Sequence, residues 1–128
     1  MTRNQTVEIN HLTVLQIQYL TELEQLEKGR GTIGAVAAKC GVKHPTVSRF
    51  FKSCIEKGYL TESLEFTDKG KKMLRWHQKV QKDVREYLER SGITEGIDDV
   101  LKGMIENIDY RRLEELTKSH MRINKEIR

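Results

Sequence analysis

The 128-residue sequence predicts a mainly α-helical protein: a winged helix-turn-helix unit followed by a second helical region. Three observations predict this fold class. A short apolar segment, a turn at Gly41 and a helix that starts at the only proline, Pro45, follow one another as in a helix-turn-helix. Apolar and polar residues then alternate from Tyr59 to Thr67, as in a small hairpin. After Met73, apolar residues recur at helical spacing.

The length suits one compact unit or a small DNA-binding domain with a helical extension. One third of the residues are charged and the net charge is +4, which favours a polyanionic partner without requiring one. No apolar run approaches the roughly 20 residues of a membrane span, and the N-terminus lacks the apolar block of a signal peptide. We therefore expect a cytoplasmic protein without membrane contact. Two cysteines, Cys40 and Cys54, are expected to be reduced core residues.

The first helix is expected from about Asn10 to Lys28, before Gly29 and Gly31. Val14 and Ile17 lie off its apolar stripe, so they indicate either a second surface for another subunit or the tail helices, or ordinary burial on two sides. The stripe itself consists of Leu12, Leu15, Tyr19, Leu23 and Leu26.

Thr32 is expected to cap a second, short helix that Gly41 terminates. Pro45 suits the first position of the third helix, where its missing N–H costs nothing. That helix is expected to end at Glu56, Lys57 and Gly58, and two short antiparallel strands are expected between Tyr59 and Thr67.

Thr67 or Asp68 is expected to cap a fourth helix that reaches Arg90, with an apolar stripe that starts at Met73. A fifth helix is expected over 97–108, and Asp109 is expected to cap a sixth that carries Leu113 and Leu116. We place the winged helix-turn-helix DNA-binding domain at 1–72 and a helical dimerisation region at 73–128. The combined apolar surface of the three tail helices exceeds what a lone winged helix needs to cover itself. This excess predicts a homodimer.

The third helix has two faces on a helical wheel. Val47, Phe50, Phe51, Cys54 and Ile55 share the inward arc, and Pro45, Arg49, Lys52, Ser53 and Glu56 lie opposite. The outward group offers a guanidinium, hydroxyls and an ammonium to bases and phosphates of double-stranded DNA. The alternative is that these charges are simply solvated. The predicted DNA-binding residues are Lys39, Lys43, His44, Pro45, Thr46, Ser48, Arg49, Lys52 and Lys71.

The predicted wing is acidic. It contains Glu62 and Glu65 but no Lys or Arg between Gly58 and Asp68, so it would repel phosphate at close approach. The basic start of the fourth helix, which includes Lys71, is better suited to phosphate, whereas the later charges of that helix indicate a solvated face.

From about Leu12 to Leu116 the chain resembles the iron- and manganese-dependent repressors of the diphtheria toxin repressor and manganese transport regulator type. The resemblance is carried by the segments 44–48 (HPTVS), 56–60 (EKGYL) and 66–71 (FTDKGK) and by three tail helices of similar length. It implies a homodimer whose recognition helices enter DNA at a palindromic operator, and tail helices that supply dimerisation and metal ligands.

The metal ligands of those repressors do not carry over to this sequence. The corresponding positions hold Gln16 and Tyr19 on the first helix, Gln81 on the fourth, and Leu101, Met104 and Ile105 on the fifth, none of them a good ligand for manganese or iron. We therefore predict no metal cofactor. His77 keeps a non-standard site open, with Glu106, His11 or Cys40 as a second ligand, although such a histidine is more often a core residue.

No Gly-rich phosphate loop, HExxH or CxxC motif is present, so we expect no catalytic residues and no enzyme activity. Together these features predict a homodimeric DNA-binding transcriptional regulator, a repressor that acts on a palindromic operator without metal activation. Two alternatives stay open: a winged-helix protein-interaction module, and a metal-responsive repressor with a non-standard site.

Overall fold

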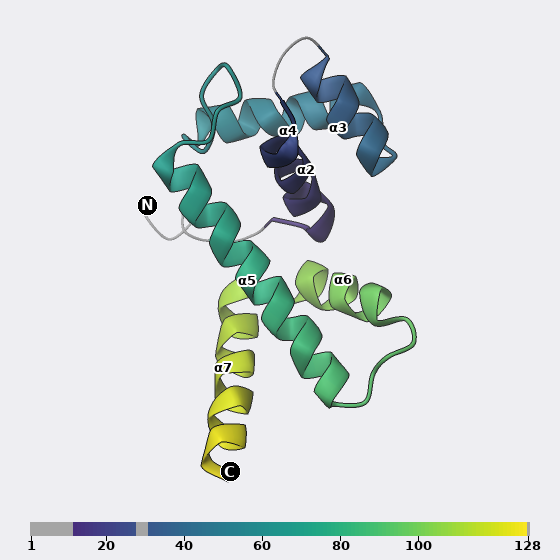
Figure 1. The fold of residues 1–128 in the computed structure, drawn as a ribbon, viewed down its shortest axis with the longest axis vertical. Helices are drawn as coiled ribbons and strands as arrows, with labels where there is room; N and C mark the ends of the chain where they lie inside the picture. The colour runs from purple at the N-terminus through teal and green to yellow at the C-terminus, as the bar shows by residue number, and fades with distance from the viewer. Residues whose placement is uncertain (1–11, 28–30, 128) are drawn as a thin grey trace. The chain divides into compact units, whose positions relative to one another are not determined.

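The computed structural model describes residues 12–27 and 31–127, with side chains as far as Lys118 (Figure 1). This part of the chain forms six α-helices and no extended strand, so the mainly helical class is confirmed. The predicted ends of the first helix, Asn10 and Lys28, lie outside the described residues, but the helix is shorter than predicted, because it begins at Val14 and ends at Gln25. The helices are α2 (Val14–Gln25), α3 (Thr32–Cys40), α4 (His44–Glu56), α5 (Asp68–Arg90), α6 (Ile97–Asn107) and α7 (Tyr110–Ile127).

The described residues pack as two compact units. Residues 15–76, here called the winged unit, hold α2, α3, α4 and the first part of α5. Residues 12–14 and 77–127, the tail unit, hold the rest of α5 with α6 and α7. The division into domains at 1–72 and 73–128 stays a prediction. Within the described residues no helix has both the length and the apolarity that a bilayer crossing needs.

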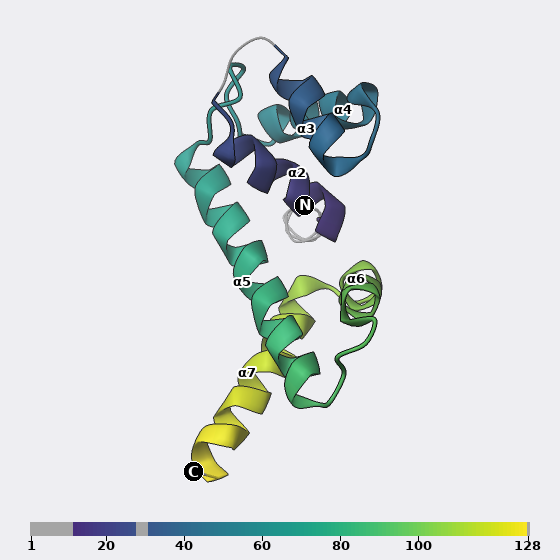
Figure 2. The ribbon, with the colours of Figure 1, turned by 45° about the vertical axis from the view of Figure 1, so that its right-hand side comes forward.

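Helices α3 and α4 lie against each other in both views (Figures 1 and 2) and form the expected helix-turn-helix. Gly41 makes the turn in the left-handed region, with φ 68°, and its N–H donates to carbonyls of the last turn of α3. The core beneath consists of apolar side chains without significant exposure: Leu20, Leu23, Val36, Val47 and Phe51.

The predicted starts of α3 and α4 need correction. The N-cap of α3 is Gly31, with φ 80°. Thr32 is the first residue of the helix, and its side chain is buried. A β-branched residue disfavours positive φ, so the glycine takes the cap position instead of Thr32. Lys43 caps α4 and His44 is its first residue, so Pro45 occupies the second position; its fixed φ suits the first turn there as well.

Helix α2 is buried on two sides. Tyr19 and Leu23 of the predicted stripe are buried, but so are Ile17 and Leu20, which lie off it, whereas Leu15 is only half-buried. Ordinary two-sided burial therefore explains Ile17 within a single chain.

The expected two-stranded hairpin is reduced to one antiparallel bridge between Leu60 and Phe66. The Thr61 N–H donates to the Glu65 carbonyl at 2.8 Å, and the Leu64 N–H donates to the Thr61 carbonyl at 2.9 Å. Leu64, within this turn, has φ 63° in the left-handed region, and Leu60–Phe66 is the one bridge of the segment. We call residues 60–66 the wing.

The wing is joined to α5 by a cap and a close backbone approach. The Thr67 hydroxyl accepts a hydrogen bond from the Gly70 N–H at 3.0 Å, which confirms Thr67 as the cap of this helix. A Cβ atom at Gly70 would lie only 2.0 Å from the Tyr59 carbonyl oxygen, so no other residue fits there.

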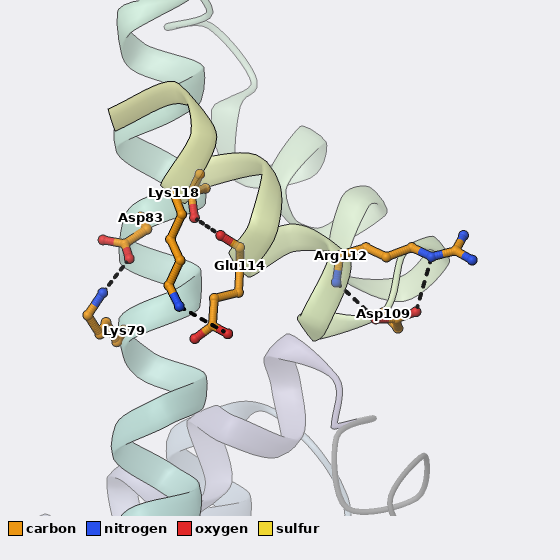
Figure 3. A network of polar contacts seen from close by, with 7 residues as sticks. Lys79, Asp83, Asp109, Arg112, Glu114 and Lys118 are labelled. Atoms are coloured by element: carbon orange, nitrogen blue, oxygen red, sulfur yellow. Dashed lines mark hydrogen bonds and ion pairs between the residues drawn. The ribbon is translucent and has the colours of Figure 1, made fainter. Parts of the chain in front are cut away.

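In the tail unit, α5, α6 and α7 bury Val80, Val84, Leu88, Leu101, Ile105, Tyr110 and Leu113. Asp109 caps α7 as predicted, because its carboxylate accepts a hydrogen bond from the Arg112 N–H at 3.0 Å. Figure 3 shows the polar surface of this unit, with ion pairs between Lys79 and Asp83, Asp109 and Arg112, and Glu114 and Lys118.

Candidate nucleic-acid interface

The inward face of α4 fixes how this helix is presented. Val47, Phe51 and Cys54 are buried, while Phe50 is half-buried and meets the ring of Tyr19 edge-on at 5.8 Å between centroids. Ile55, the last residue of the predicted inward arc, is half-buried as well. The predicted division of α4 into two faces is therefore confirmed, with the exception that Ser53 of the outward face is half-buried.

The outward face gathers most of the predicted DNA-binding residues at the start of α4. Lys43, His44, Pro45, Thr46, Arg49 and Lys52 are all exposed, and Ser48 is half-buried. Lys39 on α3 and Lys71 on α5 are also exposed, but on other elements of the winged unit. One helix and its cap thus present two lysines, an arginine, an imidazole and a hydroxyl together. DNA contact by these residues stays a prediction.

The first turn of α4 is open to an anion. Its cap, Lys43, makes no side-chain hydrogen bond to the helix, and no acidic residue occupies the first turn. The first N–H groups of a helix have no intrahelical partners and carry the positive end of the helix dipole. A phosphate oxygen could therefore be bound by backbone N–H groups as well as by the lysines.

A groove of about 520 Å³ lies between the starts of α3 and α4 and the wing. The imidazole of His44 leans over α3, since a Cβ atom at Gly34 would lie 3.9 Å from its Cδ2. Sequence reasoning missed this groove because its walls come from three separate segments. They are Gly31, Thr32 and Ile33, then His44, then Glu62, Ser63, Leu64 and Glu65.

Residues at and near the positions that bind metal in the resembled repressors contact Tyr110 in this structure. Gln81 donates a hydrogen bond from its Nε2 to the Tyr110 hydroxyl at 3.0 Å. His77 is fully buried with its ring edge-on to Tyr110 at 4.4 Å between centroids. Burial raises the pKa of Tyr110 to about 12, against a smaller lowering by Gln81, so its phenol stays neutral. Sequence reasoning did not identify Tyr110, which occupies the interior beside both residues.

His77 gains no ligand set from the neighbours suggested for it. Glu106 is exposed, Cys40 is half-buried, and His11 lies outside the described residues. Among the residues that the structure describes, no group of three or more His, Cys, Asp or Glu side chains is arranged to hold a metal ion.

The two cysteines differ in burial. Cys54 is buried, as expected of a core residue, and burial raises its pKa to about 12, which keeps the thiol protonated at neutral pH. Cys40 is only half-buried, and its pKa is raised first by burial and then by the charge of Glu22. Neither environment activates a nucleophile.

Comparison with known proteins gave one family. Neither the search of curated proteins nor the search of solved structures found a match. A family model described as "wHTH-PRTase associated" matches residues 10–94, well over half of the 128 residues. The match covers α2 to α5 and agrees with the winged helix-turn-helix built by these elements, but it lends no support to the iron- and manganese-dependent repressors in particular. The chain belongs to the wHTH-PRTase associated family, and its winged unit is a winged helix-turn-helix module.

Proposed function

We propose that this protein is a DNA-binding transcriptional regulator, a repressor that acts as a homodimer on a palindromic operator. The observation that carries the proposal is the start of α4, where Lys43, His44, Thr46 and Arg49 are exposed around a helix N-terminus without a side-chain cap. In a helix-turn-helix, these positions of the second helix face base edges in the major groove.

Each exposed group has a role in this proposal. Arg49 is the base reader, because its guanidinium can bind the two acceptors of a guanine. Thr46 and the half-buried Ser48 offer hydroxyls to bases or phosphates, and Lys43 and Lys52 neutralise phosphates on either side. Lys39 and Lys71 extend the phosphate contacts beyond α4.

The tail unit supports the homodimer. Val100 on α6 and Leu116 on α7 are the exposed large apolar side chains of the described residues, at 37% and 39% exposure. A second copy that covered them would bury apolar surface and hold two recognition helices for successive major grooves. We propose that dimerisation is independent of metal, because the contacts of Tyr110 with Gln81 and His77 take the place of a ligand set.

The first experiment selects bound duplexes from a randomised pool and then measures affinity by fluorescence anisotropy between about 50 and 200 mM salt. We expect selected sequences with two-fold symmetry. If each subunit neutralises about three or four phosphates, the logarithm of affinity should fall with the logarithm of salt with a slope of roughly −5 to −7. A flat salt response, or a monomer that ignores DNA at low salt, would refute the proposal.

A charge-matched pair of variants tests the interface itself. Arg49→Ala with Lys52→Ala should weaken operator binding by ~1–3 kcal/mol for the arginine alone and leave folding and dimerisation intact. The control, Lys82→Ala with Arg90→Ala, removes the same charge from exposed positions of the tail unit and should change affinity far less. Equal losses in both variants would mean that only net charge matters.

The family description favours a second candidate, a protein-interaction module. PRTase is the usual abbreviation of phosphoribosyltransferase, and the description associates the winged helix-turn-helix with it. On this proposal the outward face of α4 binds an acidic surface of such an enzyme. Co-expression with a phosphoribosyltransferase of the same organism followed by size-exclusion chromatography would detect the complex. A complex lost in the Arg49→Ala and Lys52→Ala variant, together with weak DNA binding at low salt, would favour this candidate over the first.

A further inference from the structure

The wing carries charge of the wrong sign for DNA. Glu62 and Glu65 are both exposed, and the segment between Gly58 and Asp68 contains no Lys or Arg. A loop that touches a phosphate backbone needs cations, because each duplex presents closely spaced negative charges. The wing of this protein therefore opposes the backbone instead of binding it.

The wing tip is held in place by its own hydrogen bonds. The Thr61 hydroxyl accepts from the Glu65 N–H at 3.1 Å and lies 3.1 Å from the Ser63 hydroxyl. The two backbone bonds that close the turn, Thr61 to Glu65 and Leu64 to Thr61, add to this restraint. These short-range hydrogen bonds restrain the backbone that carries the two glutamates.

The glutamates stand beside the start of the recognition helix. Glu62 and Glu65 line the same groove as His44, the first residue of α4, and as the first residues of α3. Neither helix start has a side-chain cap or an acidic residue in its first turn. The two helix starts that would attract phosphate therefore line the same groove as two carboxylate-bearing residues.

We infer that Glu62 and Glu65 form an electrostatic brake that lowers the affinity of α4 for DNA. The inference rests on the proposed function and assigns the wing a role within it. At roughly 8 Å in water, repulsion between a carboxylate and a phosphate reduces affinity about twofold, and more where protein replaces water. Two carboxylates near one helix start then lower affinity roughly three- to tenfold per subunit at low salt, and less as salt screens them.

The test replaces both carboxylates by neutral groups of the same shape. Glu62→Gln with Glu65→Gln should raise affinity roughly three- to tenfold per subunit at about 50 mM salt, which is roughly nine- to a hundredfold for a homodimer on both half-sites, and the gain should shrink at higher salt. The control, Glu89→Gln with Glu95→Gln, makes the same change in net charge at exposed positions of the tail unit and should alter affinity less than twofold. Thermal melting of each variant checks that the fold is kept.

The possible outcomes distinguish a failure of this inference from a failure of the proposed DNA-binding function. If the parent protein binds DNA and the wing variant gains no more than the control, the inference is wrong and the proposed function stands. If no variant binds DNA at low salt, both fail. If the double variant has a lower melting temperature than the parent protein, the single variant Glu62→Gln is used as the test. A gain of at least about twofold in DNA affinity is expected from that single change. A variant that binds DNA when the parent does not would be the strongest support for the brake.

Discussion

One polar cluster in each unit of this protein shows a different use of polar side chains. In the winged unit, Arg49 and Lys52 stand exposed on α4 above an apolar underside. In the tail unit, the buried Tyr110 meets the ring of buried His77 and accepts a hydrogen bond from the half-buried Gln81. An exposed polar group can exchange water for a partner at little cost, whereas a buried one must keep its hydrogen bonds or lose stability. The outward face of α4 is therefore open to a partner, whereas Tyr110 and its neighbours contribute to the packing of the tail unit.

The largest expected effect on stability is that of a substitution at Gly70 in the winged unit. Gly70→Ala places a Cβ atom about 2.0 Å from the Tyr59 carbonyl oxygen, so the wing or the start of α5 must move. We expect a loss of about 3–4 kcal/mol in the free energy of unfolding, measured by denaturant titration.

The same substitution in the tail unit provides the control. A Cβ atom at Gly103 in α6 meets nothing within 4 Å, so Gly103→Ala should stabilise by about 0.5–1 kcal/mol through helix propensity. Similar effects of the two substitutions would contradict the close approach at Gly70.

A smaller effect is expected at the interior of the tail unit. Tyr110→Phe removes the hydroxyl that accepts a hydrogen bond from Gln81 and should cost about 1 kcal/mol of stability. A double-mutant cycle with Gln81→Leu isolates the contact, because the cycle subtracts what each change costs by itself. Additive effects of the two substitutions would show that the hydrogen bond contributes nothing measurable.

A surface ion pair of the winged unit should matter less. Arg75 donates to both carboxylate oxygens of Glu24, at 3.0 and 2.5 Å, but the arginine side chain is 57% exposed. The coupling energy from a cycle of Arg75→Ala and Glu24→Ala should lie near 0.5 kcal/mol and fade in high salt. A value above about 2 kcal/mol would mean that water screens this pair far less than its exposure implies.

The smallest expected effect is that of chelators. Because Gln81 and His77 are committed to contacts with Tyr110, we expect DNA affinity and dimerisation to be unchanged by removal of divalent metal. Anisotropy and sedimentation with and without chelator measure both quantities. A tenfold loss of affinity that manganese restores would instead establish the metal-responsive alternative.

Local patterns predicted the order of the helices well. Helical periodicity placed the inward arc of α4. Capping chemistry identified Asp109 and narrowed the cap of α5 to Thr67 or Asp68, because both signals depend on residues within about one turn. The turn at Gly41 followed from the same kind of local signal.

Features that depend on distant residues were missed. The groove joins three segments, and the burial of Tyr110 beside His77 depends on how α5 packs with α7. The strands were over-predicted because Leu64 adopts a positive φ that its side chain disfavours, so no turn signal showed in the sequence. Thr32 was assigned as a cap because its type suits one, although the backbone places Gly31 there.

The unequal burial of the two thiols has a practical use. Cys40 is half-buried at the end of α3, just before the turn into α4, whereas Cys54 is enclosed with a pKa near 12. A maleimide dye should therefore attach to the outer sulfur first, because alkylation requires an accessible thiolate. That gives a single optical reporter close to the recognition helix, through which the arrival of a partner can be followed without any added cysteine.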